Sequence, residues 1–598
     1  MRWRSNFPVL LLTAASVVAL WPALAQRSPE SILPPGFGNP EPANTASPKQ
    51  NEQPGRTDPS GPPIASTPPS AGGLSSEIIA GLEEDISNNQ DVAVSAPVDL
   101  PPQARRSLER VGLLAPEDGG FAVDGFGATD GRFLSTLMRR MNAPVASRWA
   151  SILLRRALLS PSRVPPGVEG ADWVAERAWL LIRMGEADAA RSLVARVDSE
   201  NFTPRLYAVA MQAALAAADP SSLCSVANAA ADTSNEPSWP LSQAMCAGLS
   251  GESGTASALV DKVRDSDAAR GIDVLLAEKV VGAAVNSRRS VGIQWKGVNQ
   301  LTAWRFGLAS ATGVIIPSKL FDTVGPQVQA WQARAPLVAV AVRAPYAERA
   351  AVLGVLSSSA LVDFYSMVWD GADPSERSGS VGELLRTAYT GSGDYARVAA
   401  MRSLWNAEGF GDPYARRILT ARAAADIGPT KDYPVEDLDG LIASMLSAGL
   451  DLQAARWNNA VSTSSVGWAL LAVGNARAIE GIDASSVRSM SAGEDNRRAK
   501  FLLAALAGLG RLSADDATNL AERFDVPLSR GDSWTRALDR AAASGEAGTV
   551  ALLVATGMQT GDWKYVPPAH LYHIVVAMRR VGLEPEARMM AAEAIARS

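Results

Sequence analysis

The segment that decides the fold is 172–197, DWVAERAWLLIRMGEADAARSLVARV. Its apolar residues recur every three or four positions, which predicts two helices, and Asp172 is expected to cap the first. Gly185 is expected to end that helix, because glycine enters the left-handed conformation without a steric penalty. So short a connection makes the two helices pack antiparallel. The predicted buried positions are Trp173, Ala175, Ala178, Trp179, Leu181 and Ile182, then Ala189, Ala190, Leu193, Val194 and Val197.

The same punctuation recurs along the chain: a glycine ends one helix, and a small or branched residue follows five positions later. The pairs are Gly391 and Ala396, Gly449 and Ala454, Gly545 and Val550, and Gly582 and Ala587, with further alanines at Ala400 and Ala591. This pattern resembles the inter-helix half of a tetratricopeptide hairpin. The resemblance covers about five hairpins, without a constant period of about 34 residues. It implies an all-α fold, an irregular α-solenoid of antiparallel helical hairpins that form a TPR-like superhelix. A plain helical domain is the alternative.

Composition supports helices and excludes one class of partner. Hydrophobic residues make up 47% of the 598 residues and aromatic residues only 6%. The chain is conspicuously rich in alanine, the best helix former, which favours helix against helix. The net charge is -6, whereas nucleic-acid binding requires a basic surface. We therefore expect no nucleic-acid partner.

Residues 1–25 have the parts of a secretory signal peptide. Arg2 and Arg4 precede an apolar run from Val9 to Leu20, and Ala23-Leu24-Ala25 forms a small-x-small cleavage site. A retained membrane anchor is the alternative, but a run of about twelve residues is short for the roughly twenty that span a bilayer. We expect cleavage after Ala25, a periplasmic or secreted protein, and no transmembrane segment in the mature chain.

The rest of the chain divides by composition. Residues 26–73 are rich in proline between Pro29 and Pro69, which predicts a disordered linker. Residues 74–100 predict a short helix and a further linker. Residues 101–598 are expected to form the α-helical repeat body. Within this body, Pro345 sits where a helix can begin, and Ser357 is expected to cap the next helix.

Cys224 and Cys246 are the only cysteines, and export would place them in an oxidising compartment. Asn235 to Pro240 supplies a turn between two apolar helical stretches, so the two thiols can face each other across a hairpin. The sequence predicts a disulfide between them. Two buried free thiols are the alternative.

The sequence carries no recognised motif for catalysis or metal binding. No G-x-S-x-G elbow and no phosphate-binding G-x-x-x-x-G-K-[ST] loop occurs in the sequence. His570 and His573 share a helix face, but no cysteine or third histidine lies near them, so they are expected to pack or cap. We expect no metal and no cofactor.

The segment from Asp118 to Gly131 has aspartate-glycine pairs every six residues. Spaced aspartates in a glycine-rich loop can bind calcium, but the spacing matches no EF-hand. Asp-Gly is also a common turn pair, so the favoured interpretation is an ordered surface loop.

The predicted binding residues lie between 288 and 306. Tryptophan and arginine anchor interfaces and stack on sugars and peptides. The alternative is that the tryptophans are core residues and the arginines are solvated. We call this set the tryptophan–arginine surface; it consists of Arg288, Arg289, Trp295, Lys296, Trp304 and Arg305.

These patterns favour an exported, periplasmic helical-repeat scaffold that has no catalytic activity and binds a protein or a cell-envelope component. The alternative is a cell-wall hydrolase with unrecognised paired carboxylates. That alternative requires a cleft in which two acids converge at about 5–10 Å.

Overall fold

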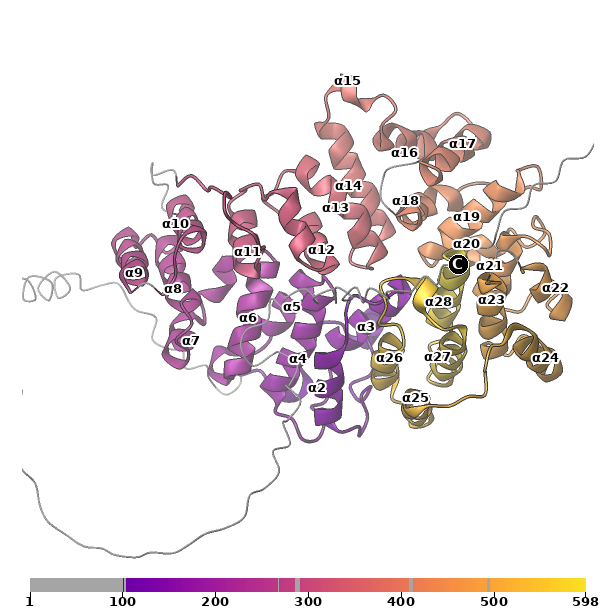
Figure 1. Ribbon diagram of the computed structural model, residues 1–598, viewed down its shortest axis with the longest axis horizontal. Helices are drawn as coiled ribbons and strands as arrows, with labels where there is room; N and C mark the ends of the chain where they lie inside the picture. Colours follow the sequence, from indigo (N-terminus) through magenta and orange to yellow (C-terminus); the bar gives the residue numbers. More distant parts are fainter. Residues whose placement is uncertain (1–100, 102–103, 267, 285–290, 408–411, 492–494) are drawn as a thin grey trace, which may run out of the picture. The chain divides into compact units, whose positions relative to one another are not determined.

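The computed structural model describes residues 101, 104–266, 268–284, 291–407, 412–491 and 495–598. The predicted signal peptide (1–25), the linker (26–73) and the segment 74–100 lie outside these residues, as do Arg288 and Arg289. The helices belong to one unit, which includes Leu108–Ser598. Helices and no strands occur in the described ranges, so the all-α class is confirmed (Figure 1). No helix among them is long and apolar enough to cross a membrane.

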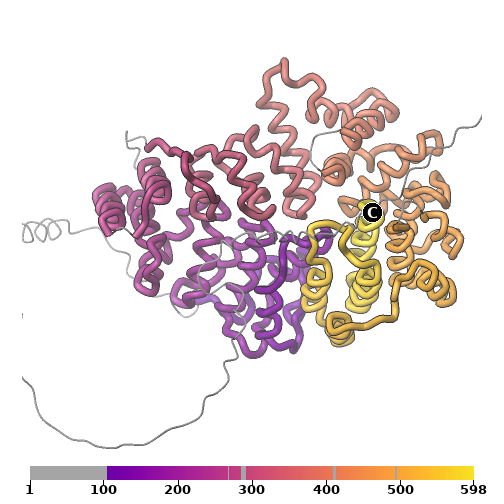
Figure 2. The backbone as a smooth tube through the Cα atoms, viewed as in Figure 1, coloured from indigo at the N-terminus to yellow at the C-terminus, as the bar shows by residue number. Residues whose placement is uncertain are grey.

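The helices follow one another through short turns, and Figure 2 shows them as successive coils. The first group is α2 (Gly131–Arg140), α3 (Arg148–Leu159), α4 (Gly170–Arg183), α5 (Ala187–Val194), α6 (Pro204–Ala216), α7 (Ala227–Thr233), α8 (Ser238–Leu249), α9 (Ser253–Asp265), α10 (Ile272–Ala284) and α11 (Ala303–Ala311). The second is α12 (Pro326–Arg334), α13 (Val340–Val352), α14 (Ser358–Gly371), α15 (Pro374–Arg377), α16 (Val381–Thr390), α17 (Asp394–Trp405), α18 (Pro413–Ala425), α19 (Val435–Ser447) and α20 (Asp451–Ala455). The third is α21 (Val466–Gly474), α22 (Ala484–Ser489), α23 (Arg497–Gly508), α24 (Ala514–Phe524), α25 (Ser533–Ala543), α26 (Ala547–Thr556), α27 (Pro568–Arg580) and α28 (Glu584–Ala596). Short 3-10 helices are η1 (Leu108–Arg110), η2 (Pro116–Asp118), η3 (Ser199–Asn201), η4 (Pro220–Leu223), η5 (Ser318–Thr323) and η6 (Trp563–Tyr565).

The hairpin of α4 and α5 forms as the sequence predicts. Gly185 has φ +91°, in the left-handed region, and the two helices pack together. The predicted stripe is buried, apart from the half-buried Ala189. The predicted cap is wrong, because the N-cap of α4 is Glu169. Asp172 lies inside the first turn and accepts a hydrogen bond from Thr203 Oγ1 at 2.7 Å, which ties α4 to the start of α6.

The other glycine-punctuated hairpins also form, with one change of register. The residue five positions after the glycine is buried in α20, α26 and α28, at Ala454, Val550 and Ala587. Ala396 is exposed instead, so that prediction is wrong. The physical reason is one extra residue: α17 begins three positions after Gly391, whereas α20, α26 and α28 begin two positions after their glycines.

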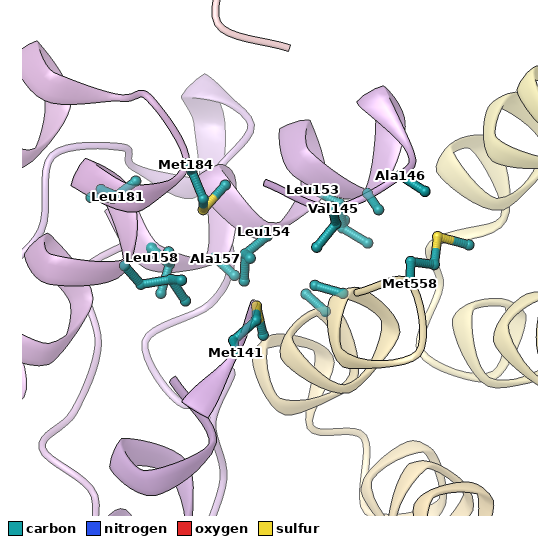
Figure 3. Packing of buried hydrophobic residues seen from close by; sticks show 14 of the residues in the cluster. Met141, Val145, Ala146, Leu153, Leu154, Ala157, Leu158, Leu181, Met184 and Met558 are labelled. Carbon is teal, nitrogen blue, oxygen red and sulfur yellow. The ribbon is translucent and has the colours of Figure 1, made fainter. Parts of the chain in front are cut away.

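The first helices pack against the last ones. In Figure 3, Val145 and Ala146 lie near Met558 of the C-terminal segment, and the Ala146 amide donates to the Met558 carbonyl at 3.0 Å. α3 contacts both α26 and α28. In a solenoid each repeat contacts only its neighbours. The contact of α3 with the last helices is not one between neighbouring repeats. The hairpins are present, but the predicted superhelical arrangement is not confirmed.

Glu593 of α28 joins the two ends of this helical body. Its side chain is buried and accepts hydrogen bonds from Ser147 Oγ at 2.6 Å and from the amides of Arg148 at 2.9 Å and Trp149 at 3.1 Å. These amides belong to the first turn of α3, where a helix has unpaired N–H groups and a partial positive charge. A carboxylate from the end of the chain thus caps a helix near its beginning.

Cys224 and Cys246 are bonded as predicted, with a Cα–Cα distance of 5.4 Å, and they tie the segment after η4 to α8. A disulfide that closes a loop of this length stabilises the fold by about 3 kcal/mol in the chain-entropy model. We expect the double variant C224S/C246S to lose about that much free energy of unfolding in urea titrations. Reduction of the native chain should reproduce the loss, and an unchanged midpoint would contradict it.

Candidate functional site

A cavity of about 370 Å³ opens where distant parts of the chain meet. Its walls come from the first half of α3, the end of α12, the segment that leads into α14, the last turn of α18 and the turn between α19 and α20. We call it the arginine–serine pocket. The lining residues are Arg148, Trp149, Ile152, Arg155, Arg334, Gly354, Val355, Ser357, Ser358, Ser359, Ala360, Arg422, Ala448 and Leu450.

Arg148 is the most deeply buried cation of the pocket, with 4% of the residue exposed. Its Nη1 donates to the carbonyls of Ala351 and Leu356, while its Nε has no hydrogen-bond partner among the described residues. Burial lowers the pKa of Arg148. An anion in the pocket would favour the charged form of this guanidinium.

The other three arginines differ in whether a carboxylate neutralises them. Arg155 pairs with Glu186 at 2.6 Å, and Arg334 pairs with Asp188 at 2.6 Å. Arg422 is exposed and forms no ion pair with a carboxylate within the described part of the chain, and the same holds for the guanidinium of Arg148. Two of the four positive charges in the lining are therefore uncompensated by a direct partner.

Three consecutive serines begin α14 at the pocket. Ser357 caps the helix, as predicted, by accepting a hydrogen bond from the Ala360 amide at 3.1 Å. Its hydroxyl also lies 3.0 Å from that of Ser359. Ser358 is 7% exposed, and no described group bonds to its Oγ. A buried polar atom without a partner costs free energy, so this hydroxyl is a cost to the fold.

The remaining wall of the pocket is apolar. It consists of Trp149, Ile152, Val355, Ala448 and Leu450. The indole of Trp149 packs on Gly449, where an added Cβ would lie 2.9 Å from the ring, and the φ of +77° also favours glycine there. The Trp149 Nε1 is buried and unpaired within the described structure. The pocket therefore offers a basic side and an apolar side.

The chemistry of the lining fits an anion. It supplies guanidinium groups, serine hydroxyls and the positive end of a 14-residue helix. No aspartate, glutamate, histidine or cysteine occurs among the described residues of the lining. Such a set can hold and orient a negative group, whereas general acid–base catalysis uses a side chain that exchanges protons near neutral pH.

The predicted tryptophan–arginine surface lies on other elements and splits into two parts. Arg305 of α11 donates two hydrogen bonds to Asp273 of α10, at 2.8 and 2.9 Å, and Trp304 Nε1 donates to the Asp273 carbonyl at 3.0 Å. Trp295 Nε1 donates to the Ile315 carbonyl at 3.1 Å, and Lys296 is exposed. Trp304 and Arg305 thus join α11 to α10, while Trp295 and Lys296 lie beside the turn that follows α11.

A second cavity, of about 390 Å³, holds both cations and carboxylates. Arg402 pairs with the buried Asp437, and the guanidinium of Arg417 lies 5.7 Å from the centre of the Trp405 ring. One cation and one carboxylate of this cavity are thus engaged with each other, while Glu436 also lines it.

The loop from Asp118 to Gly131 has a packing role. Asp130 caps α2 through the Phe133 amide at 2.8 Å, and the Gly125 carbonyl accepts a hydrogen bond from the Gly548 amide of α26 at 2.7 Å. Thr129 Oγ1 donates to Glu546 at 2.5 Å. The loop thus contributes to the contact between the first and last helices, in addition to being the ordered loop that was predicted.

The two histidines of α27 make packing contacts. His570 Nδ1 lies 3.0 Å from the Gly557 carbonyl, and its ring lies 4.5 Å from that of Trp534. Across the described ranges, no three histidine, cysteine, aspartate or glutamate side chains are grouped as metal ligands would be.

Burial lowers the pKa of His573, and Asp539 opposes this effect. Because the folded-state pKa lies below the unfolded value, the unfolded chain binds more protons as the pH falls. We expect the free energy of unfolding to decrease as the pH falls below about 6.5, and the variant His573→Gln to show a smaller decrease. Urea titrations at pH 7.5, 6.5 and 5.5 measure the two slopes, with His570→Gln as the comparison. Identical slopes for the native chain and His573→Gln would contradict the assignment.

Sequence reasoning missed most of the pocket. Its arginines lie on three helices that are far apart in the sequence, so no local motif joins them. The signal that was present is the run Ser357-Ser358-Ser359 at a helix start, of which only the capping role of Ser357 was predicted. Comparisons with models of protein families, with curated proteins and with solved structures find nothing that matches this chain.

Proposed function

We propose that this chain is an exported helical scaffold that binds an anionic component of the cell envelope in the arginine–serine pocket, without catalysing a reaction. The observation that carries the proposal is the convergence of four arginines and the serine-rich start of α14 on one cavity with an apolar wall. Small-ligand sites combine an apolar lining with a few placed polar groups, in cavities of about 300–1,000 Å³.

The experiment is isothermal titration calorimetry with four anions at constant ionic strength: inorganic phosphate, benzoate, phenyl sulfate and phenyl phosphate. At least one should bind saturably with a stoichiometry of one. Arg422→Met should weaken that binding about tenfold, because an exposed arginine contributes charge to the pocket without supporting the fold. Arg580→Met removes an equally exposed arginine on α27 and is the matched control. Absence of saturable binding by all four anions would overturn the proposal.

Export is supported by the signal-like residues 1–25 and by the disulfide between Cys224 and Cys246, since disulfides persist in oxidising compartments. Cell fractionation followed by N-terminal sequencing tests this part. The mature chain should begin at Gln26 and be found outside the cytoplasm. A full-length chain with two free thiols would contradict it.

The tryptophan–arginine surface is the proposed contact for a protein partner. Ile315, whose carbonyl accepts a hydrogen bond from Trp295, is 65% exposed, so an apolar side chain accompanies the tryptophan there. Crosslinking in intact cells from a photoreactive residue at Lys296 should give a discrete adduct that Trp295→Ala abolishes. Adducts of identical yield in both chains would remove this surface from the proposal.

A cell-wall hydrolase remains the alternative, and it requires two free carboxylates that converge on a cleft. The second cavity is lined by two carboxylates, Glu436 and Asp437, but Asp437 is 1% exposed and is engaged by Arg402. This pairing favours binding over hydrolysis.

A further inference from the structure

The second cavity is lined by residues of α17, α18 and α19, three helices that pack against one another. Its volume of about 390 Å³ falls within the range of small-ligand sites. It shares no lining residue with the arginine–serine pocket, so a ligand here is independent of the anion site proposed above. The lining residues are Arg402, Trp405, Asn406, Arg417, Pro434, Glu436 and Asp437.

Trp405 holds one cation of this cavity in place. The residue is 8% exposed, and its Nε1 donates to Thr420 Oγ1 at 2.8 Å, which fixes the orientation of the ring. The guanidinium of Arg417 lies 5.7 Å from the ring centre, within the range of a cation–π contact. Arg417 Nη1 also donates to the Gly440 carbonyl at 3.4 Å. The guanidinium is therefore positioned by the protein before a ligand arrives.

The other edge of the Arg417 guanidinium is free. Its Nε and Nη2 form no hydrogen bond in the described structure, and neither atom is enclosed, so both remain accessible. No carboxylate of the described ranges forms an ion pair with Arg417. Burial lowers the pKa of Arg417, and the charges of Asp439 and Arg498 act on it in opposite directions. The Nε–Nη2 edge of an arginine matches the two oxygens of a carboxylate.

Glu436 supplies a free negative charge to the same cavity. It is exposed and forms no hydrogen bond or ion pair with another described residue. Arg402 is engaged by Asp437, which raises the pKa of Arg402 more than Glu436 does. The amide of Asn406 is exposed beside them and both donates and accepts hydrogen bonds.

The charges of the cavity fit a ligand that carries both signs. The lining holds two arginines and two acids, so its formal charge is zero. A simple anion would leave Glu436 without a partner, and a simple cation would leave Arg417 without one. We propose that this cavity binds a small zwitterion of the amino-acid class, with its carboxylate on the Nε–Nη2 edge of Arg417 and its ammonium group on Glu436. The carbon atoms between the two groups would contact Pro434 and the edge of Trp405.

Ligand-observed nuclear magnetic resonance titrations of the purified protein test this site. The probes are zwitterions of increasing charge separation, namely glycine, β-alanine, γ-aminobutyrate and ε-aminocaproate, while propionate and propylamine each carry only one of the two charges. At neutral pH and constant ionic strength, at least one zwitterion should bind saturably and about tenfold more tightly than propionate or propylamine. Absence of saturable binding by all four zwitterions would overturn the proposal, as would propionate binding as tightly as the best of them.

Glu436→Gln tests the ammonium contact without disturbing the fold, because the exposed carboxylate makes no described contact. We expect this variant to bind the best zwitterion about tenfold more weakly, with unchanged binding of propionate and an unchanged urea midpoint. Glu522→Gln, at an exposed acid of α24, is the matched control and should alter none of these quantities. Native affinity of the Glu436 variant for the zwitterion would refute the proposal.

Arg417→Met tests the carboxylate contact. It should weaken the binding of both the zwitterion and propionate about tenfold, and Arg417→Lys, which keeps the charge but lacks the two-donor edge, should recover only part of the affinity. Arg386→Met removes an exposed arginine of α16 and is the control. Urea titrations of each variant show whether it is folded. A folded Arg417→Met chain that binds the zwitterion as the native chain does would count against the site.

Discussion

Replacement of Arg177 by methionine is expected to lower the free energy of unfolding by about 3–5 kcal/mol. The arginine is fully buried in α4 and has no carboxylate partner among the described residues. Its guanidinium donates to three carbonyls, those of Leu158 at 2.8 Å, Val111 at 2.9 Å and Ser160 at 2.8 Å. Methionine fills most of the volume but leaves all three carbonyls unpaired, and each such group costs about 1–3 kcal/mol.

Urea titration followed by circular dichroism measures this loss. Arg196→Met removes an exposed arginine after α5 and should change stability by no more than about 0.5 kcal/mol. Limited proteolysis gives a local readout, because Arg177 holds the segment around Val111, which should become susceptible to cleavage. A variant as stable and as protected as the native chain would show that these hydrogen bonds give no net stabilisation.

Replacement of Glu593 by glutamine is expected to cost about 3 kcal/mol, because a neutral amide replaces a buried, charged cap. The carboxylate accepts from Ser147 and from two amides of α3, and it also pairs with Arg597 at 3.0 Å. Glutamine has one acceptor oxygen, and its NH₂ group would face other donors. The change should therefore weaken the contact between α28 and α3.

Glu586→Gln is the matched control on the same helix. Glu586 pairs with Arg156, and both side chains are partly exposed, so this pair should be worth about 1 kcal/mol or less. Urea titrations of the two variants compare the two roles directly. Equal losses of free energy of unfolding would show that the Glu593 cap on α3 stabilises the fold no more than the partly exposed Glu586–Arg156 pair does.

Local features of the fold could be predicted, because they depend on neighbours in the sequence. The apolar period of α4, the left-handed glycine at Gly185 and the disulfide all follow from short-range rules. Helix ends were less certain. Asp172 is a good capping residue, yet α4 starts earlier, and Asp172 instead accepts from Thr203 of the following segment. Pro345 was expected to begin a helix and lies inside α13.

The pocket and the pairing of the chain ends could not be predicted, because they depend on tertiary contacts. Glu593 and Ser147 are separated by 446 positions, and no periodic pattern connects them. Arg148 resembles any other arginine in an amphipathic helix until the carbonyls of the distant α13 region meet its guanidinium. Whether a charged side chain is buried depends on which distant segments pack against it, and a single sequence does not identify those segments.

The pairing of α3 with α28 sets a condition on how the chain folds. Leu153 and Leu154 of α3 are fully buried, and helices near the other end of the chain, α26 and α28, pack against α3. Until a ribosome has synthesised those helices, the nascent N-terminal part lacks this cover and exposes apolar surface that chaperones and proteases recognise. A chain that ends before Glu593 would thus lack the cap on α3 and leave apolar side chains of that helix without their cover.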